Sequence, residues 1–100
     1  MRWAAAGLAF GLAGAAQGED GLGRKVFNQL AQPPCQLCHT LKAAGAEGKV
    51  GPSLDELQPN LDQVLAAVRT GSGVMPPFVD KLTPEQIEAV SRFVADTAGK

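Results

Sequence analysis

The chain has 100 residues, a formal net charge of −1 and 45% hydrophobic residues, so it has room for one small domain. This length excludes a multidomain enzyme. The balanced charge excludes a strongly basic nucleic-acid-binding surface and a disordered polyelectrolyte. After the first 18 residues, the only aromatic side chains are Phe27, Phe78 and Phe93. Because so few large side chains build a thin core, we expect a cross-link or a prosthetic group to stabilise the domain.

The first 18 residues have the pattern of a cleavable secretory signal peptide. Arg2 provides a positive charge, an apolar stretch runs from Trp3 to Ala16, and small residues close the segment. The 14 residues of that stretch fall short of the roughly 20 that a membrane span needs. We therefore predict cleavage after residue 15, 16 or 18 and an exported mature domain over residues 19–100 that does not span a membrane. A retained N-terminal anchor is the alternative.

The exported part begins with a predicted helix over residues 21–31. Leu22, Val26 and Leu30 recur every four residues, which places them on one face of a helix. Gln32-Pro33-Pro34 follows. The helix should end there, because a proline ring disfavours helical geometry at the residue before it.

Two further helices carry clear start signals. Asn60 is followed three residues later by Gln63, as in a capping box, and Gly71 is the expected end of this helix. The last helix begins at Thr83-Pro84-Glu85-Gln86. This segment combines a capping residue, a proline at the first helical position and a reciprocal glutamine. Gly99 is its expected end.

The stretches between these helices, residues 42–59 and 70–82, are rich in glycine or proline and show no alternation of apolar and polar residues. Within them, Asp55-Glu56 is interpreted as the start of a short helix, and no strand is predicted. The prediction is an all-α domain whose long loops surround a bound group.

Both cysteines and the single histidine of the chain lie in five consecutive residues, Cys35-Gln36-Leu37-Cys38-His39. Cys-X-X-Cys-His is the attachment signature of c-type haem. Two thiols three residues apart can form thioethers with the two vinyl groups of one porphyrin, and the adjacent imidazole can bind the iron. A thiol–disulfide pair would be expected in an α/β fold, and a zinc site would need a fourth ligand. The sequence therefore predicts one covalently attached haem c.

Met75 is the candidate for the second axial ligand of the iron. It is the only methionine left after removal of the signal peptide, and Pro76 and Pro77 directly follow it. The alternative is that Met75 fills a gap in the core, which methionine does more often than it binds a metal.

Several landmarks occur in a characteristic order over residues 20–99. They are Gly23 and Phe27, the Cys35–His39 motif, Gly51-Pro52, Met75-Pro76, and a terminal helix bearing Phe93. This order resembles that of class I monohaem cytochromes c, above all the short bacterial and algal carriers of the c6 and c551/c552 kind. The resemblance implies a small all-α cytochrome c fold, with three main helices, short helical turns and long loops around one haem.

The resemblance also implies roles for single residues. The first and last helices should cross where Gly23 and Phe27 meet Phe93. The carbonyl of Pro52 should accept a hydrogen bond from Nδ1 of His39 and fix the orientation of the ring. Arg69 is a candidate contact of a haem propionate, with a solvated surface arginine as the alternative.

A haem iron bound by histidine and methionine has no vacant position for a substrate, which favours electron transfer. We therefore expect a periplasmic carrier of single electrons that is not an enzyme. A haem-based sensor or a peroxidase-like protein with a labile sixth ligand is the alternative. A thiol redox protein without haem is a second alternative.

The expected partners are other redox proteins, in transient complexes with a monomer of this chain. The donor would be a dehydrogenase or reductase, and the acceptor another cytochrome or an oxidase. Small cytochromes similar to this one also serve molybdenum enzymes such as sulfite dehydrogenase. The contact should lie at the exposed haem edge, close to Gln36, Leu37, Val74, Pro76 and Pro77, and the nearly neutral charge argues against strong electrostatic steering.

Overall fold

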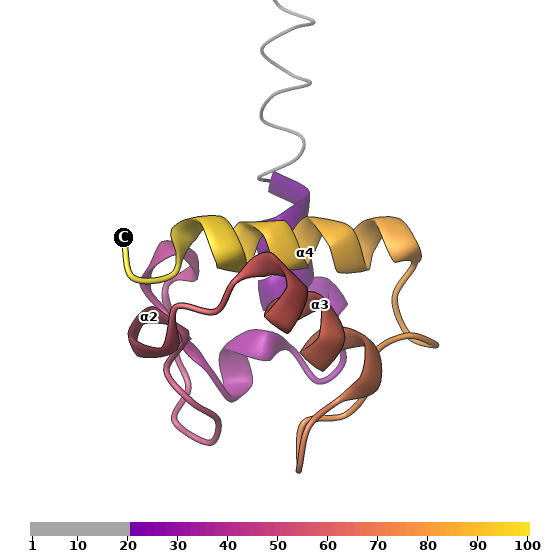
Figure 1. The fold of residues 1–100 in the computed structure, drawn as a ribbon, viewed down its shortest axis with the longest axis horizontal. Coiled ribbons are helices and arrows are strands. Elements are labelled where there is room, and N and C mark those ends of the chain that lie inside the picture. The colour runs from indigo at the N-terminus through magenta and orange to yellow at the C-terminus, as the bar shows by residue number, and fades with distance from the viewer. Residues whose placement is uncertain (1–20) are drawn as a thin grey trace, which may run out of the picture.

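The computed structural model describes residues 21–100, and the predicted signal peptide over residues 1–18 lies outside this range (Figure 1). Residues 21–25 are helical and lead directly into the π-helix η1 (Val26–Leu30). The other elements follow in chain order: η2 (Cys35–Leu37), β1 (Thr40–Leu41), η3 (Lys42–Ala44), β2 (Ala46–Glu47), α2 (Leu54–Leu57), α3 (Leu61–Thr70) and α4 (Pro84–Thr97).

The first helix ends at Leu30, one residue before the predicted end. Ala31 has an extended backbone with ψ of 140°, and its N–H donates to the carbonyl of Val26 at 3.0 Å. The prolines at positions 33 and 34 follow directly, as the sequence predicted.

Helices α3 and α4 both begin with complete capping boxes. The side chain of Asn60 accepts from the N–H of Gln63 at 2.8 Å, and the Gln63 side chain accepts from the Asn60 N–H at 2.9 Å. Thr83 and Gln86 make the same pair of bonds at 3.1 and 2.9 Å. Gly71 directly follows α3 with φ of 76°, so both predicted starts and this predicted end are confirmed.

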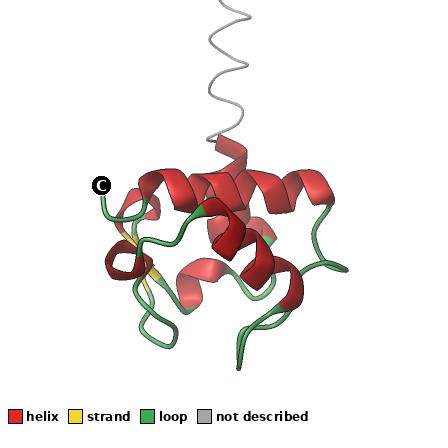
Figure 2. Cartoon of the chain, viewed as in Figure 1, coloured by secondary structure: helices red, strands yellow, loops and turns green. Residues whose placement is uncertain are grey.

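One expectation about the loops was wrong. β1 pairs antiparallel with β2, with Thr40 opposite Glu47 and Leu41 opposite Ala46 (Figure 2). Each strand has two residues, which is too short to produce a readable alternation in the sequence. Gly45, with φ of 65°, provides the left-handed turn between them. The remaining elements are helical, as predicted, and Asp55-Glu56 lies in the first turn of α2.

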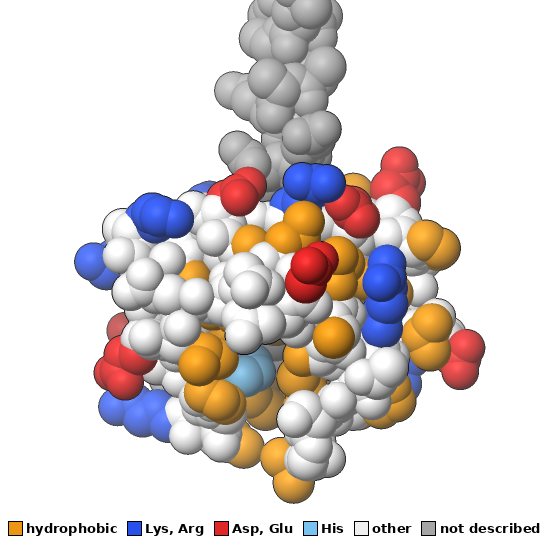
Figure 3. Space-filling model, in the orientation of Figure 1, with side chains coloured by type: hydrophobic (Ala, Val, Ile, Leu, Met, Phe, Trp, Pro, Cys, Tyr) orange, Lys and Arg blue, Asp and Glu red, His pale blue; other side chains and the backbone are white. Residues whose placement is uncertain are grey.

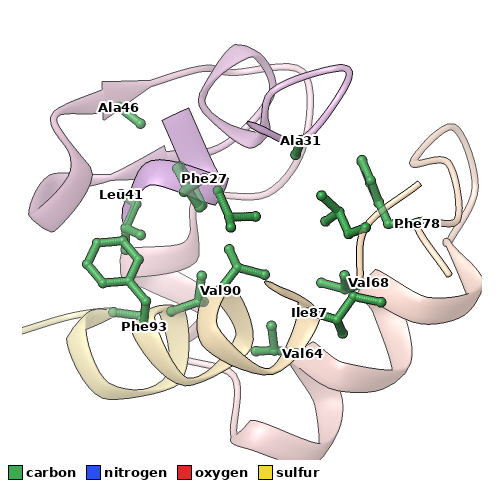
Figure 4. Close-up of a cluster of buried hydrophobic side chains, with 14 residues drawn as sticks. Phe27, Ala31, Leu41, Ala46, Val64, Val68, Phe78, Ile87, Val90 and Phe93 are labelled. Atoms are coloured by element: carbon green, nitrogen blue, oxygen red, sulfur yellow. The ribbon is translucent and has the colours of Figure 1, made fainter. Parts of the chain in front are cut away.

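The core forms where the first helix crosses α4 and where α3 packs beside α4 (Figure 4). Phe27 and Phe93 meet edge to face, with ring centroids 6.3 Å apart and planes inclined by 67°. At Gly23 a Cβ atom would lie 2.5 Å from Cβ of Phe93 and 2.6 Å from the carbonyl oxygen of Ala89. The helices therefore approach closely at Gly23, and the predicted crossing is confirmed.

No helix within residues 21–100 has both the length and the apolar composition that crossing a membrane requires.

The crossing yields a stability prediction. Gly23→Ala should lower the free energy of unfolding by about 1–3 kcal/mol, because the added methyl group has no space against α4. Chemical denaturation of the haem-loaded protein measures this change.

Gly21→Ala is the matched control, because Gly21 lies in the same helix and a Cβ there meets no atom of residues 21–100 within 4 Å. It should leave stability unchanged or raise it by up to ~1 kcal/mol. Equal effects of the two substitutions would contradict the close crossing.

Candidate haem-binding site

The Cys-X-X-Cys-His motif folds as a tight turn. Pro34 is extended, with ψ of 143°, and η2 begins directly after it at Cys35. The N–H groups of Cys38 and His39 both donate to the carbonyl of Cys35, at 3.2 and 3.0 Å. The turn therefore holds the two cysteines and the histidine close together.

The two thiols of the motif have different surroundings. Both cysteines are free and half-buried, and Cys35 packs against the core cluster. Burial raises the pKa of the Cys35 thiol to about 11, with a further rise from the neighbouring Cys38 that a backbone hydrogen bond opposes. Cys35 is therefore a neutral thiol at physiological pH, held at the edge of the core.

His39 is fixed by the segment that contains Gly51 and Pro52. Its Nδ1 lies 2.8 Å from the carbonyl oxygen of Pro52. Because a carbonyl can only accept, Nδ1 carries the proton and Nε2 is left with a free lone pair for a metal. The N–H of Gly51 also donates to the carbonyl of Cys38 at 2.7 Å. The hydrogen bond that the resemblance implied is present.

Gly51 allows this contact because it lacks a side chain. A Cβ atom at this position would lie 2.6 Å from Cε1 and 3.0 Å from Nδ1 of His39. In the sequence Gly51 is a landmark only, and this contact with His39 is the physical reason for a glycine there. The imidazole therefore lies directly on the Gly51 backbone.

Met75 lies in a separate turn that is held by backbone hydrogen bonds. Ser72 and Met75 exchange two of them, at 3.0 and 2.9 Å. The N–H of Phe78 donates to the carbonyl of Val68 at 2.8 Å and ties the end of the loop to α3. Met75 is half-buried and packs against the core cluster, so the gap-filling alternative also agrees with its position.

The histidine is visible at the floor of a hollow on one face of the molecule (Figure 3). Hydrophobic side chains gather on both sides of it. The segment around residue 50 lies on one side of the hollow and the 71–76 loop lies on the other (Figures 1 and 3). The loop in whose sequence Met75 occurs therefore borders the hollow that contains the histidine.

Arg69 lies near the end of α3 and is exposed. Within residues 21–100 its side chain makes no hydrogen bond or ion pair, which agrees with a solvated arginine. The propionate contact stays a prediction.

The donor set fits a covalently attached haem. It offers two thiols on one turn, an imidazole whose Nε2 has a free lone pair, and a methionine in the loop that borders the hollow. Among residues 21–100, no group of three or more His, Cys, Asp or Glu side chains is arranged to hold a metal ion. The zinc alternative therefore has no support in this part of the chain.

Besides its place at the start of a helix, Asp55 accepts hydrogen bonds from two distant backbone N–H groups, those of Lys42 and Gly99. This role was not predicted from the sequence. No sequence signal marks such contacts, because every residue except proline carries a backbone N–H.

Comparisons with known proteins identify the family of the chain. Residues 19–94 match the family described as cytochrome C oxidase, cbb3-type, subunit III. The chain is 32% identical over 82 residues to a cytochrome c6 of Leptolyngbya boryana, covering 78% of this chain and 92% of that protein. It is 34% identical over 88 residues to a cytochrome c6 of Gloeothece citriformis, covering 83% of this chain and 76% of that protein.

The crystal structure of the c-type cytochrome SorU from Sinorhizobium meliloti has the same fold. It superposes with a TM-score of 0.79 at 48% sequence identity, over 84% of this chain and 95% of that one. The predicted fold class and the family resemblance are both confirmed. The chain belongs to the small monohaem c-type cytochromes, the electron-transfer proteins that bind haem c covalently.

Proposed function

We propose that this cytochrome is a periplasmic carrier of single electrons that works with one haem, whose iron is bound by His39 and Met75. It is not itself an enzyme. The predicted signal peptide supports export. The observation that carries the proposal is the 2.8 Å contact between Nδ1 of His39 and the Pro52 carbonyl, because it leaves Nε2 as the free donor of the motif.

A bound haem c supplies an iron centre that gains and loses one electron. The chain determines the surroundings of that centre. Cys35 and Cys38 provide the thioether bonds from a single turn. The Pro52 carbonyl keeps the proton on Nδ1 and makes the imidazole a more basic ligand.

The Met75 loop supports the same function. Its Ser72–Met75 turn and the two prolines after Met75 restrict the backbone on both sides of the thioether. A loop with so little freedom changes little when the charge of the iron changes. A thioether ligand also raises the reduction potential relative to a second imidazole.

The number and attachment of haems can be tested by intact mass spectrometry of the exported protein. We expect the mass of the mature chain plus one haem, with neither Cys35 nor Cys38 open to alkylation. An unmodified mass with two reactive thiols would contradict the proposal and favour the thiol redox alternative.

Met75→Ala tests the sixth ligand. In the haem-loaded protein we expect a lower reduction potential and a new ability of the ferrous form to bind carbon monoxide, because the thioether is lost. Spectroelectrochemistry and carbon monoxide titration measure both changes.

Val74→Ala is the control, since the neighbouring side chain is 89% exposed and provides no ligand. An unchanged spectrum and potential in Met75→Ala would show that Met75 does not bind the iron. Carbon monoxide binding by the wild-type protein would instead favour the sensor or peroxidase-like alternative.

The face around the histidine is suited to a redox partner. The segments beside the hollow are residues 33–39, which end at the histidine, residues 48–54 and residues 70–77 (Figures 1 and 3), and Lys49 is the one Asp, Glu, Lys or Arg in them. Their exposed apolar side chains include Leu37, Val50 and Val74, at 62%, 72% and 89% exposure. Such a face favours a transient apolar contact over electrostatic steering.

The partners that we propose are a periplasmic dehydrogenase or reductase as donor, for example a molybdenum sulfite dehydrogenase, and another cytochrome or an oxidase as acceptor. The mature protein would meet each partner as a monomer and leave after one electron has moved. The three segments beside the hollow form its rim. Because this rim carries so little charge, the association rate should respond only weakly to ionic strength.

Val74→Lys tests this face. It should slow the second-order electron transfer with a cognate dehydrogenase about tenfold, because an ammonium group would be desolvated on docking. The reduction potential should change little. Stopped-flow spectroscopy over a range of salt concentrations measures the rate.

Leu57→Lys is the matched control. Leu57 is also exposed, at 58%, and it lies at the end of α2, outside the three segments beside the hollow. Equal slowing by both substitutions, or a steep salt dependence of the wild-type rate, would contradict docking through the apolar rim.

A further inference from the structure

Asp55 connects three parts of the fold through its two carboxylate oxygens. Oδ2 accepts from the backbone N–H of Lys42 at 2.8 Å, and Oδ1 accepts from the backbone N–H of Gly99 at 2.9 Å. The side chain of Ser53 already caps α2, at 3.4 Å from the Glu56 nitrogen. The Asp55 carboxylate is therefore used for contacts outside its own helix.

The contact with Lys42 belongs to a series in constant register. The N–H of Gly51 donates to the carbonyl of Cys38 at 2.7 Å, and Nδ1 of His39 donates to the carbonyl of Pro52 at 2.8 Å. The Lys42–Asp55 bond follows three residues further along both segments. The partners of the last two bonds are 13 residues apart, so residues 38–42 and 51–55 run side by side without a shift.

The contact with Gly99 fixes this pair of segments to the end of α4. Gly99 has φ of 78°, and a Cβ atom there would lie 2.5 Å from Cδ of Gln58. The positive φ favours glycine at this position, and the exposed side chain of Gln58 lies against it. Asp55 thus joins the segment after His39, the segment after Pro52, and the end of the last helix.

We propose that Asp55 is a positioning residue for His39, which holds the Pro52 carbonyl in hydrogen-bonding distance of Nδ1 by fixing the register of residues 39–42 against 52–55. The inference rests on the proposed function, since it takes His39 as an axial ligand. Through the strength of the His39–Pro52 bond, Asp55 would tune the basicity of the imidazole and hence the reduction potential.

The charged groups near Asp55 fit this role. Lys42, Glu56 and Lys100 line the same surface recess as Asp55 and Gly99. The N–H of Gly99, then that of Lys42, hold the pKa of Asp55 below its usual range. A carboxylate with a lowered pKa contributes its stabilisation at neutral pH and loses it as the pH falls through the lowered value. The contact is therefore complete under physiological conditions.

Asp55→Asn tests the proposal, because asparagine keeps one acceptor oxygen and turns an N–H₂ group against the other backbone N–H. In the haem-loaded protein we expect the Nδ1 proton of His39 to exchange with solvent about fivefold faster, as its bond to Pro52 weakens. A less basic imidazole stabilises ferric iron less, so the reduction potential should also rise. Proton NMR and voltammetry measure the two quantities.

Glu56→Gln is the matched control. Glu56 is the next residue of the same helix, is exposed, and loses the same charge on substitution. In this variant the Nδ1 proton of His39 should exchange at the wild-type rate, and any rise in the reduction potential should be smaller than in Asp55→Asn. Deletion of residues 99 and 100 removes the Gly99 contact and the bonds of Lys100 to Asp96 and Thr97, but it leaves the contact between Asp55 and Lys42. It should therefore accelerate the exchange less than Asp55→Asn does.

The proposal is overturned if Asp55→Asn and Glu56→Gln shift both quantities equally, since charge alone would then explain them. It is also overturned if Asp55→Asn lowers only the resistance to denaturant, and the deletion likewise leaves the Nδ1 proton unchanged. Failure of the proposed function has a different signature. In that case the His39 resonances of the oxidised wild-type protein would lack the paramagnetic shifts of an iron ligand.

Discussion

The hydrogen bond from His39 to the Pro52 carbonyl connects the haem-binding motif to the rest of the fold. An imidazole has two nitrogens and a rotatable ring, and this bond selects one nitrogen and one orientation. The bond requires the 51–52 segment to lie against the motif, which is possible because Gly51 has no side chain to meet the ring. The turn of residues 35–39, the 51–52 segment and α2 after it are therefore joined through one acceptor, the Pro52 carbonyl.

The crossing of the first helix with α4 stabilises this unit from the other side. Phe27 and Phe93 are buried there, and Cys35 packs against the same cluster. The motif is thus held between an apolar core and the hydrogen bonds that join residues 38–42 to residues 51–55. Apolar contact excludes water from one side of the site, while the hydrogen bonds fix the orientation of the His39 ring. A haem fixed in this way has the constant surroundings that electron transfer requires.

The sequence predicted the features that depend on neighbouring residues. The capping boxes of α3 and α4 each occupy four consecutive residues, and the haem-attachment motif occupies five, so each was readable locally. The strands β1 and β2 were missed because two residues cannot show a period. The roles of Gly51 and Asp55 were missed because they depend on distances between segments that are far apart in the sequence. Asp55 also bonds to backbone N–H groups, which every residue except proline has.

The weakly charged rim of the hollow also has a consequence for two copies of the chain. Carriers with a strongly charged rim repel one another at the face where electrons leave, because like charges meet there. Here Lys49 is the one charged residue of the three segments around the histidine, and the whole chain carries a formal net charge of −1. A reduced and an oxidised copy can therefore meet face to face with little repulsion. Electron exchange between copies should quickly equalise the redox state of all molecules of this cytochrome, so that one molecule can deliver an electron that another received.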